Sequence, residues 1–355
     1  MLRPTSIALL VLAGTALAQV PPTHISPKSA TSGLGNANNN IPFSWTPTGY
    51  QQVHSLASFS STSPVPFTKM SLRMGSGFTN RPGFQIDVEL AVANSTNDSN
   101  AASAVFNLNE VPGSRVTVFT RKGLNLVAVP NNDWVVTFPF DNFFIYTGQT
   151  HLSWSAAVYG NTNGNAFFVY PLDAWWKIGQ SSRTGSFAGC SSAAGGTRAA
   201  SQSVSTVNLR PGGVANFTGN SYVPAGGLPA LMAIGGSSTN YGGLPLPYDM
   251  SGIGATGCSV TNDILLTLAG VTNANANGDV VIPLAVPANP ALSGVIFYTQ
   301  FYFLQSGANP LGLFTSNGQT NTVGTDPLVT RIFVGNPSAT SGTLDTGFGM
   351  AVGFN

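Results

Sequence analysis

The sequence predicts an all-β protein made of two antiparallel β-sandwich domains in tandem, each jelly-roll-like. Apolar and polar residues alternate over strand-length segments, and clusters of Gly, Pro, Asn and Ser separate these segments. No segment shows the 3.6-residue period of an amphipathic helix. A chain of 355 residues also exceeds the usual size of one sandwich domain. We therefore expect a first domain at residues 41–180 and a second at residues 186–355.

Residues 1–18 have the features of a secretory signal peptide. Arg3 provides a basic start, an apolar run extends from Ile7 to Ala13, and Ala16-Leu17-Ala18 ends the segment. This run is too short to span a bilayer and no longer one follows, so no membrane span is expected. The sequence thus predicts an exported protein, secreted or held at the cell surface. Residues 19–40, rich in Pro and Asn, are expected to form a flexible lead-in.

Charged residues make up only 7% of the chain, whereas 43% of its residues are hydrophobic. That hydrophobic content argues against the alternative of a disordered Gly- and Asn-rich chain. Without Arg3 the mature chain has 13 − 1 = 12 basic residues against 12 acidic ones. A neutral chain has no basic surface for nucleic acid, so no nucleic-acid partner is expected.

In the first domain, two alternating segments on either side of residues 75–83 predict an antiparallel hairpin. Its register places the carboxylates Asp87 and Glu89 beside Arg73 and Lys69 on the outer face, with apolar residues paired on the inner face. Further strands of this domain are expected at residues 52–59, 115–121, 124–129, 133–140, 150–158 and 166–171.

In the second domain, the longest strand signal extends from Gly294 to Gln305. It has bulky apolar residues on both faces, which is typical of a central strand in a sandwich. Asn277-Gly278-Asp279 predicts a tight hairpin turn between the two apolar runs that flank it. Further strands are expected at residues 204–209, 228–234, 263–268, 280–286, 328–334 and 344–354.

The two cysteines, Cys190 and Cys258, predict one disulfide, because thiols oxidise in an exported chain. Closing a loop of this length stabilises a fold by roughly 4 kcal/mol in the chain-entropy model.

Motifs around these cysteines resemble the C-terminal module of secreted proteins best known from planctomycete genomes. The cysteines match, and so do the segments NGDVVIPLAVPANPALSGVIFYTQFYFLQ and GANPLGLFTSNG. The similarity covers residues 186–324 well and residues 45–180 only through the order of strands. The resemblance implies a secreted β-sandwich protein. It implies no reaction, cofactor or catalytic residue, because the family has none assigned.

Catalytic candidates are few. Of the three histidines, His24 lies in the expected lead-in, while His54 and His151 fall on outward positions of predicted strands. Neither a G-x-S-x-G elbow nor an H-E-x-x-H motif occurs. Asp87 and Glu89 share one face of a strand, as a glycosidase pair could, but their backbone separation of roughly 6.5–7 Å falls between the spacings of the two glycosidase classes. The predicted ion pairs account for both carboxylates. We therefore predict no catalytic residue and no cofactor.

Four aromatic residues are candidates for a sugar-binding platform, namely Trp45, Tyr170, Trp175 and Trp176. Adjacent residues of a strand point to opposite sides, so at most one of Trp175 and Trp176 should be exposed. The alternative is that Trp176 covers the end of the first sandwich or the contact between the domains.

A run of oxygen-bearing side chains, Asn273, Asn275, Asn277 and Asp279, is a weak calcium candidate. Calcium sites require several carboxylates, whereas this run has one, so a simple turn is the preferred interpretation and no metal is predicted.

The C-terminal segment Leu344–Phe354 alternates bulky residues with Gly and Ala. It is expected to be the last strand of the second domain, or else to complete the sheet of a neighbouring copy in self-assembly. Our first hypothesis is an exported, non-enzymatic protein with a surface, matrix, adhesive or assembly role. The alternative is a carbohydrate-binding module or glycan-active enzyme whose partner is extracellular polysaccharide.

Overall fold

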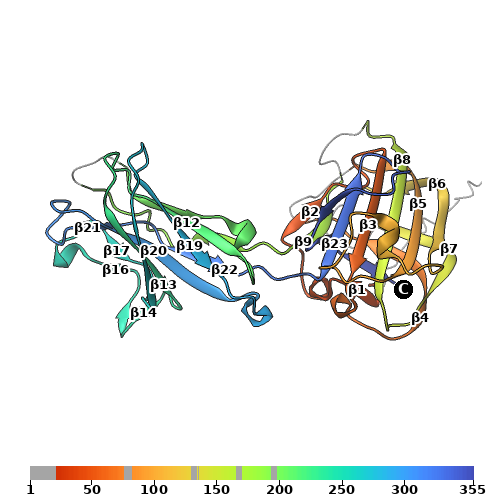
Figure 1. Ribbon diagram of the computed structural model, residues 1–355, viewed down its shortest axis with the longest axis horizontal. Helices are drawn as coiled ribbons and strands as arrows, with labels where there is room; N and C mark the ends of the chain where they lie inside the picture. Colours follow the sequence, from red (N-terminus) through yellow and green to blue (C-terminus); the bar gives the residue numbers. More distant parts are fainter. Residues whose placement is uncertain (1–20, 76–81, 129–133, 135, 165–169, 193–197) are drawn as a thin grey trace, which may run out of the picture. The chain divides into compact units, whose positions relative to one another are not determined.

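The computed structural model describes residues 21–75, 82–128, 134, 136–164, 170–192 and 198–355. The regular secondary structure of the described chain is β-strand apart from a few short 3-10 helices, which confirms the predicted all-β sandwich class. It divides into two compact units (Figure 1). The first joins the residues up to Ala174 with Val329–Asn355, and the second is Trp175–Leu328. Across the described residues, no helix has the length and hydropathy to cross a membrane.

The first unit is built on two larger sheets and one small one. Their strand orders are β1-β26-β4-β7, β24-β23-β3-β8-β5-β6 and β2-β9-β25. The strands are β1 His24–Ser26, β2 Ala37–Asn39, β3 Thr48–His54, β4 Val65–Leu72, β5 Phe84–Ser95, β6 Val116–Leu126, β7 Val136–Tyr146, β8 His151–Asn161, β9 Leu172–Trp176, β23 Val329–Val334, β24 Thr343–Asp345, β25 Phe348–Met350 and β26 Val352–Phe354, with 3-10 helices η1 Lys28–Thr31, η2 Leu56–Ser58 and η3 Phe106–Asn109.

The core of the first unit lies between its two larger sheets. Alternate residues of each strand face inward, as half-buried antiparallel strands require. Phe67 and Leu72 of β4 and Phe138 of β7 meet Val88 of β5 and Trp154 of β8, and all five side chains are buried. This packing of two sheets through their apolar faces defines a sandwich.

The N-terminal segment from Pro21 onward is ordered, so the prediction of a flexible lead-in is wrong for these residues; Gln19 and Val20 lie outside the described residues. Strand β1 pairs with β26. Arg73 donates from Nη1 to the backbone oxygen of Ala30 at 2.9 Å and pairs through Nε with Asp173 at 2.7 Å. Asp173 accepts the backbone N–H of Gly35 at 2.8 Å. Side chains far along the chain thus provide hydrogen-bond partners for backbone groups of this segment, so its order does not depend on a periodic pattern of its own residues.

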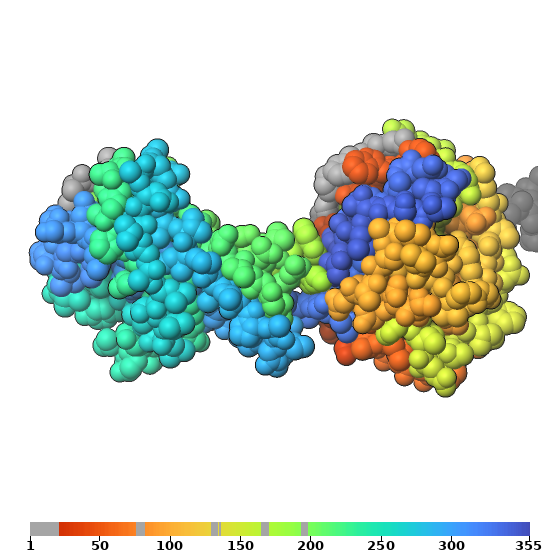
Figure 2. Space-filling model, viewed as in Figure 1, coloured from red at the N-terminus to blue at the C-terminus, as the bar shows by residue number. Residues whose placement is uncertain are grey.

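The C-terminal strands belong to the first unit and not to the second, which corrects the predicted domain boundary. Strand β23 pairs with β3, and β26 lies between β1 and β4. Phe354 is fully buried and stacks on Phe67 with 4.6 Å between ring centroids. In Figure 2 the blue C-terminal residues accordingly lie among the orange and red residues of the first unit. The chain therefore leaves the first unit, builds the second, and returns.

This location also explains why one side of the last strand is bare. A Cβ atom on Gly353 would lie 2.3 Å from the Cβ of Pro22, closer than real side chains approach. The glycine thus allows the N-terminal segment to pack directly on β26. The segment predicted as one strand, Leu344–Phe354, forms three short strands in three sheets, β24, β25 and β26. Because β26 already has a neighbour on both edges, Val352–Phe354 is not free to complete the sheet of another copy.

The hairpin predicted around residues 75–83 does not form, because β4 and β5 lie in different sheets. Strand β4 pairs with β7 and β5 pairs with β6 and β8. Asp87 therefore meets Arg121 of β6, at 2.7 Å, and not Arg73. Alternation correctly predicted which side chains of β4 and β5 face the core. The two sheets of a sandwich share one core, however, so two strands whose apolar faces match can lie in opposite sheets and need not be hydrogen-bonded to each other.

The described part of the second unit has two larger sheets, with strand orders β10-β22-β20-β13-β18 and β11-β12-β19, and two two-stranded sheets, β14-β15 and β16-β17. Its strands are β10 Gln180–Arg183, β11 Ser201–Val204, β12 Val214–Asn220, β13 Pro229–Gly235, β14 Asn240–Tyr241, β15 Leu244–Pro245, β16 Tyr248–Asp249, β17 Ser259–Val260, β18 Leu266–Val271, β19 Asp279–Ala285, β20 Ile296–Leu304, β21 Leu313–Thr315 and β22 Gln319–Thr322, with 3-10 helices η4 Thr206–Asn208, η5 Ser251–Ile253 and η6 Pro290–Leu292.

Strand β20 is central in its sheet, as predicted, with β13 on one edge and β21 and β22 on the other. The expectation from its two apolar faces that both would be covered is wrong, because Ile296 is 53% and Leu304 39% exposed. Phe301 and Phe303 are buried in the core of this unit. Cys190 and Cys258 form the predicted disulfide. The turn at Asn277-Gly278 forms, but it connects β18 and β19, which lie in different sheets. The predicted hairpin is therefore wrong.

Candidate functional site

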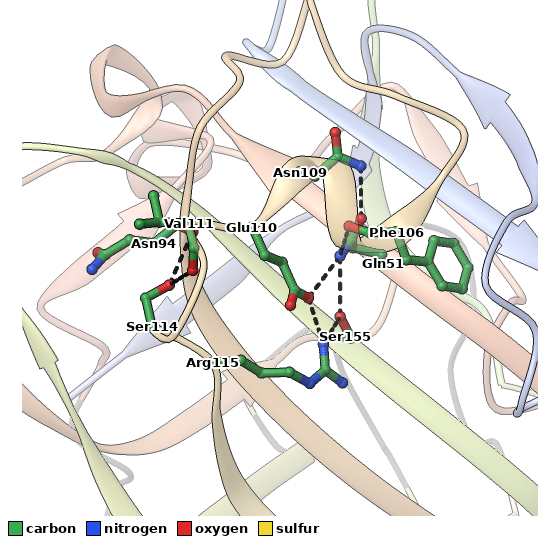
Figure 3. Close-up of polar contacts among 9 residues, drawn as sticks. All are labelled: Gln51, Asn94, Phe106, Asn109, Glu110, Val111, Ser114, Arg115 and Ser155. Carbon is green, nitrogen blue, oxygen red and sulfur yellow. Dashed lines mark hydrogen bonds and ion pairs between the residues drawn. The ribbon is translucent and has the colours of Figure 1, made fainter.

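A polar cluster lies on the outer face of the first unit, opposite the core side of β3 (Figure 3). We call it the Gln51 cluster; it comprises Gln51, Asn109, Glu110, Arg115 and Ser155. The Gln51 amide oxygen accepts from Asn109 Nδ2 at 2.8 Å, and its amide nitrogen donates to Glu110 Oε1 at 3.1 Å. Glu110 also forms an ion pair with Arg115. These bonds hold residues 103–115 over the sheet, which buries Gln51 completely.

A second group of bonds in the same view secures the end of this segment (Figure 3). Val111 donates its backbone N–H to the oxygen of Asn94 at 2.9 Å. Ser114 donates its hydroxyl to the backbone oxygen of Val111 at 2.8 Å. Ser103, at the other end of the segment, exchanges two hydrogen bonds with the Asn109 side chain, so both ends are fixed.

The chemistry available to the Gln51 cluster is limited. Ser155 Oγ lies 3.4 Å from Gln51 Nε2 and 3.5 Å from Arg115 Nη1, and both of these atoms are donors. Neither can accept the serine proton. The recess beside them, which Glu89 also lines, has a volume of about 90 Å³. Pockets for organic ligands usually measure ~300–1,000 Å³. The cluster therefore serves to position residues 103–115.

His54 lies in the interior of the first unit, so its predicted outward position is wrong. It is completely buried, and Ser26 Oγ lies 2.7 Å from its Nδ1 atom. A Ser–His pair at this distance is the geometry of an activated nucleophile. Both side chains are fully buried, however, so a substrate has no access to them.

The tautomer of His54 shows that the pair is structural. Met350 donates its backbone N–H to Gln52 Oε1 at 2.8 Å and accepts from Gln52 Nε2 at 2.9 Å, which fixes the orientation of that amide. Gln52 Nε2 and Trp154 Nε1 therefore both donate to His54 Nε2, at 2.9 and 3.2 Å. The imidazole proton must then lie on Nδ1 and point to Ser26. The histidine donates to the serine and does not act as its base.

The described recesses include a groove beside Trp45 that is large enough for a ligand. Its volume is about 540 Å³. Trp45 is 46% exposed at this groove. The lining comes from the segment before β3 and from β23 and β24, and it contains no ionisable side chain: Ile41, Trp45, Thr46, Pro47, Thr48, Phe333, Val334, Gly335 and Thr343. We call this the Trp45 groove.

The local structure holds Trp45 in place. Thr48 donates its hydroxyl to the backbone oxygen of Trp45, which closes the turn that leads into β3. Ile41 beneath the groove belongs to the core of the unit. Phe333 packs partly against the same core. The indole is therefore presented on a rigid framework, which lowers the conformational entropy lost on binding.

The other aromatic candidates do not join Trp45. Tyr170 is completely buried and donates its hydroxyl to the backbone oxygen of Val127 at 3.0 Å, and burial raises its pKa. It therefore belongs to the core and not to a sugar platform. Trp175 and Trp176, at the end of β9, are both partly buried and fall in the second unit. Alternation did not separate an exposed member from a buried one.

The calcium candidate forms a turn stabilised by its own hydrogen bonds. Asn275 Oδ1 accepts the backbone N–H of Asn277 at 2.9 Å, and Asp279 Oδ1 accepts from Asn275 Nδ2. The backbone N–H of Asn273 donates to the oxygen of Asp279 at 2.7 Å. Within the described residues, His, Cys, Asp and Glu side chains do not gather in groups of three or more that could hold a metal ion. The turn geometry accounts for these oxygen atoms.

These observations define the class of the protein as an all-β chain of two sandwich units with an uncharged groove in the first. Comparison of the chain with protein-family models, with curated proteins and with solved structures found no match. The resemblance of residues 186–324 to secreted planctomycete proteins stays a prediction.

Two internal polar groups were not predicted. The buried ion pair of Arg73 and Asp173 joins residues 100 positions apart, and the His54 network joins β1, β3, β8 and the C-terminal segment. Strand alternation places a polar residue on a face but does not say which distant segment will cover that face. The neighbouring Asn39, Tyr50 and Gln52 gave no sequence signal beyond ordinary polar positions.

Proposed function

We propose that this chain is an exported, non-enzymatic contact protein with a surface, matrix or adhesive role. The observation that supports this role best is the Trp45 groove, which combines a large volume, a half-exposed indole and an uncharged lining. Binding there would draw on removal of apolar surface from water and on ring stacking. Proton transfer in catalysis uses ionisable groups, which the groove's lining does not supply.

A direct test is the binding of the purified mature chain to extracellular material from the source cells, with Trp45→Ala as the variant. We expect binding to fall at least tenfold, because truncation removes the exposed ring. Phe143→Ala is the matched control, since Phe143 is also an exposed aromatic, at 61%, but lies outside the groove. Equal binding by the wild type and Trp45→Ala would contradict the proposal.

Carbohydrate is the second candidate, and a specific feature of the groove favours it. The hydroxyl-bearing residues Thr46 and Thr343 line the same space as the Trp45 ring. An apolar ring face with hydrogen-bonding groups at its border matches a pyranose, which has an apolar face and a rim of hydroxyls. The proposed ligand is therefore an extracellular polysaccharide that stacks on Trp45.

A glycan array followed by calorimetric titration separates the two candidates. For a glycan ligand, Trp45→Ala should weaken binding about tenfold, equivalent to ~1.4 kcal/mol, while Phe143→Ala leaves it unchanged. Binding to cell material without any glycan signal would favour a protein or lipid ligand instead. Release of reducing sugar from a bound polysaccharide would reveal an enzyme and refute the non-enzymatic role.

A further inference from the structure

Two sheets of the second unit end side by side in unpaired edge strands. Strand β18 is the last strand of one sheet and β19 the last strand of the other. An unpaired edge presents backbone N–H and C=O groups that another extended strand can bind.

The register shows which backbone groups of β18 are unpaired. The backbone N–H of Thr272 donates to the oxygen of Leu228, and the same pairing continues from Val271 with Pro229 to Leu266 with Ile234. Hydrogen-bonded and non-hydrogen-bonded pairs alternate in an antiparallel ladder, so the even residues of β18 bond to β13. The N–H and C=O groups of Thr267, Ala269 and Val271 consequently point away from the sheet.

The edge of β19 is protected, and that of β18 is not. The backbone N–H of Val286 donates to the backbone oxygen of Gly213, so the even residues of β19 bond to β12. By the same alternation the backbone N–H and C=O groups of residues 281, 283 and 285 point away from the sheet. Residue 283 is a proline, which has no N–H and blocks strand addition. Strand β18 has neither proline nor charge. Other long edges of the described sheets are also protected, β6 by Arg121 and Lys122 and β7 by Pro139.

The side chains around this edge are unusually apolar for a surface. Leu265 is 76% exposed, Leu266 51% and Val271 62%. Soluble proteins protect such an edge because a long, uncharged, apolar strand promotes pairing with another chain. Here the protection is present on β19 and absent from its neighbour β18, which marks β18 as the edge that accepts a partner.

We infer that β18 pairs antiparallel with β18 of a second copy of this chain, with Ala269 opposite Ala269 on a two-fold axis. Three residue pairs then exchange backbone hydrogen bonds: Ala269 with its counterpart, and Thr267 with Val271 in both directions. The sheets of two second units join into one continuous sheet.

Charge and symmetry favour a second copy as the occupant. A two-fold axis places each residue near the axis close to the same residue of the second copy. A charged edge strand would therefore bring like charges together, whereas β18 has no charged residue. The same axis sets the β-branched side chains of Thr267 and Val271 against each other, a stabilising cross-strand combination. Because β26 is enclosed in the first unit, self-association through β18 replaces the donor-strand hypothesis for the C-terminal strand.

This inference deepens the contact role proposed above by naming a partner, but its test measures mass and not ligand binding, so either can fail alone. One strand pair buries a small area, and the dimer should therefore dissociate on dilution. Sedimentation equilibrium of the purified mature chain over a concentration series should show a monomer–dimer equilibrium. A strict monomer at every concentration would overturn the inference.

Proline and lysine substitutions locate the interface. Ala269→Pro removes an outward N–H without removing a bond to β13, and it should weaken the dimer at least tenfold. Ala285→Pro makes the same change at an outward position of β19 and should leave the dimer unchanged. Thr267→Lys introduces a protective charge and gives a second test if the proline variant does not fold. A dimer that survives both Ala269→Pro, once folded, and Thr267→Lys would refute pairing through β18.

Cross-linking tests the register itself. The two native cysteines are joined in a disulfide, so an introduced cysteine is the single thiol. In the proposed register Ala269→Cys places two thiols on paired residues, whose Cα atoms lie ~5.5 Å apart. A short bismaleimide should join them, while Thr267→Cys, whose counterpart lies about four residues along the strand, should react far less. The opposite pattern would contradict the two-fold position.

Discussion

His54 is fully buried, and both of its ring nitrogens have uncharged hydrogen-bond partners. Burial lowers the pKa of His54 to about 3, because a charged imidazolium would lose its hydration and gain no counter-ion from Ser26, Gln52 or Trp154. The neutral ring thus connects the N-terminal strand, the strand β8 and the C-terminal segment.

This pKa predicts acid sensitivity of the first unit. Because the pKa is lower in the folded than in the unfolded chain, neutral His54 stabilises the fold fully above pH ~6.5, and this contribution is lost as the pH falls toward 3. We expect the free energy of unfolding to fall by on the order of 4 kcal/mol across this range. Urea unfolding at a series of pH values measures this change in the free energy of unfolding.

Two variants isolate the histidine in that experiment. His54→Gln should be less stable at neutral pH but lose this part of the pH dependence. His151→Gln is the control, because it replaces a partly buried histidine of β8 that lies outside the His54 network. A pH profile of His54→Gln that is parallel to the wild-type profile would show that other groups cause the acid sensitivity.

At the scale of single residues, the sequence predicted apolar burial better than polar burial. The inner face of β5 follows from alternation, because an apolar side chain gains free energy in any dry environment. A buried polar side chain requires a specific partner. Two of the three partners of His54 lie 28 and 100 positions away, and Asp173 lies 100 positions from Arg73, so local patterns carried no information about these pairs.

At the scale of elements, β26 is a short strand whose position was not predicted. It comprises three residues, all buried, between β1 and β4. Alternation predicted it as the end of one long strand, Leu344–Phe354, whereas that segment forms β24, β25 and β26 in three different sheets. Whether this strand joins the first or the second unit depends on which sheet has an unpaired edge for it, and the apolar pattern of the strand alone does not contain that information.

Phe354→Ala should destabilise the first unit by roughly 3–5 kcal/mol, because it removes a fully buried ring that stacks on Phe67 and leaves a cavity. Thermal and urea unfolding would measure the loss. Phe143→Ala, at a position that is 61% exposed, should change stability by less than about 0.5 kcal/mol. If Phe354→Ala were equally mild, the C-terminal strand would not be part of this core.

At the scale of the whole molecule, each unit has a separate core, and the disulfide lies in the second. The bond joins Cys190 to Cys258, which are 68 positions apart and both buried. A cross-link of this span restricts the unfolded chain of the second unit and leaves the unfolded chain of the first almost unchanged.

Calorimetry of the Cys190→Ala/Cys258→Ala variant should therefore show two transitions with one displaced. We expect the second unit to lose roughly 4 kcal/mol and unfold at lower temperature, while the transition of the first unit stays in place. The Phe354→Ala variant identifies the first-unit transition. Displacement of both transitions together would contradict independent cores.

The sequence by itself determined the all-β class, most strand positions, the disulfide and the central place of β20, because these depend on local apolar patterns and on the tendency of two cysteines to pair. The tertiary structure alone decided which strands pair, that the chain returns to the first unit, that His54 is buried, and that Trp45 and not Tyr170 is exposed. These outcomes depend on contacts between residues far apart in the chain, and a strand pattern specifies which face is buried without specifying what buries it.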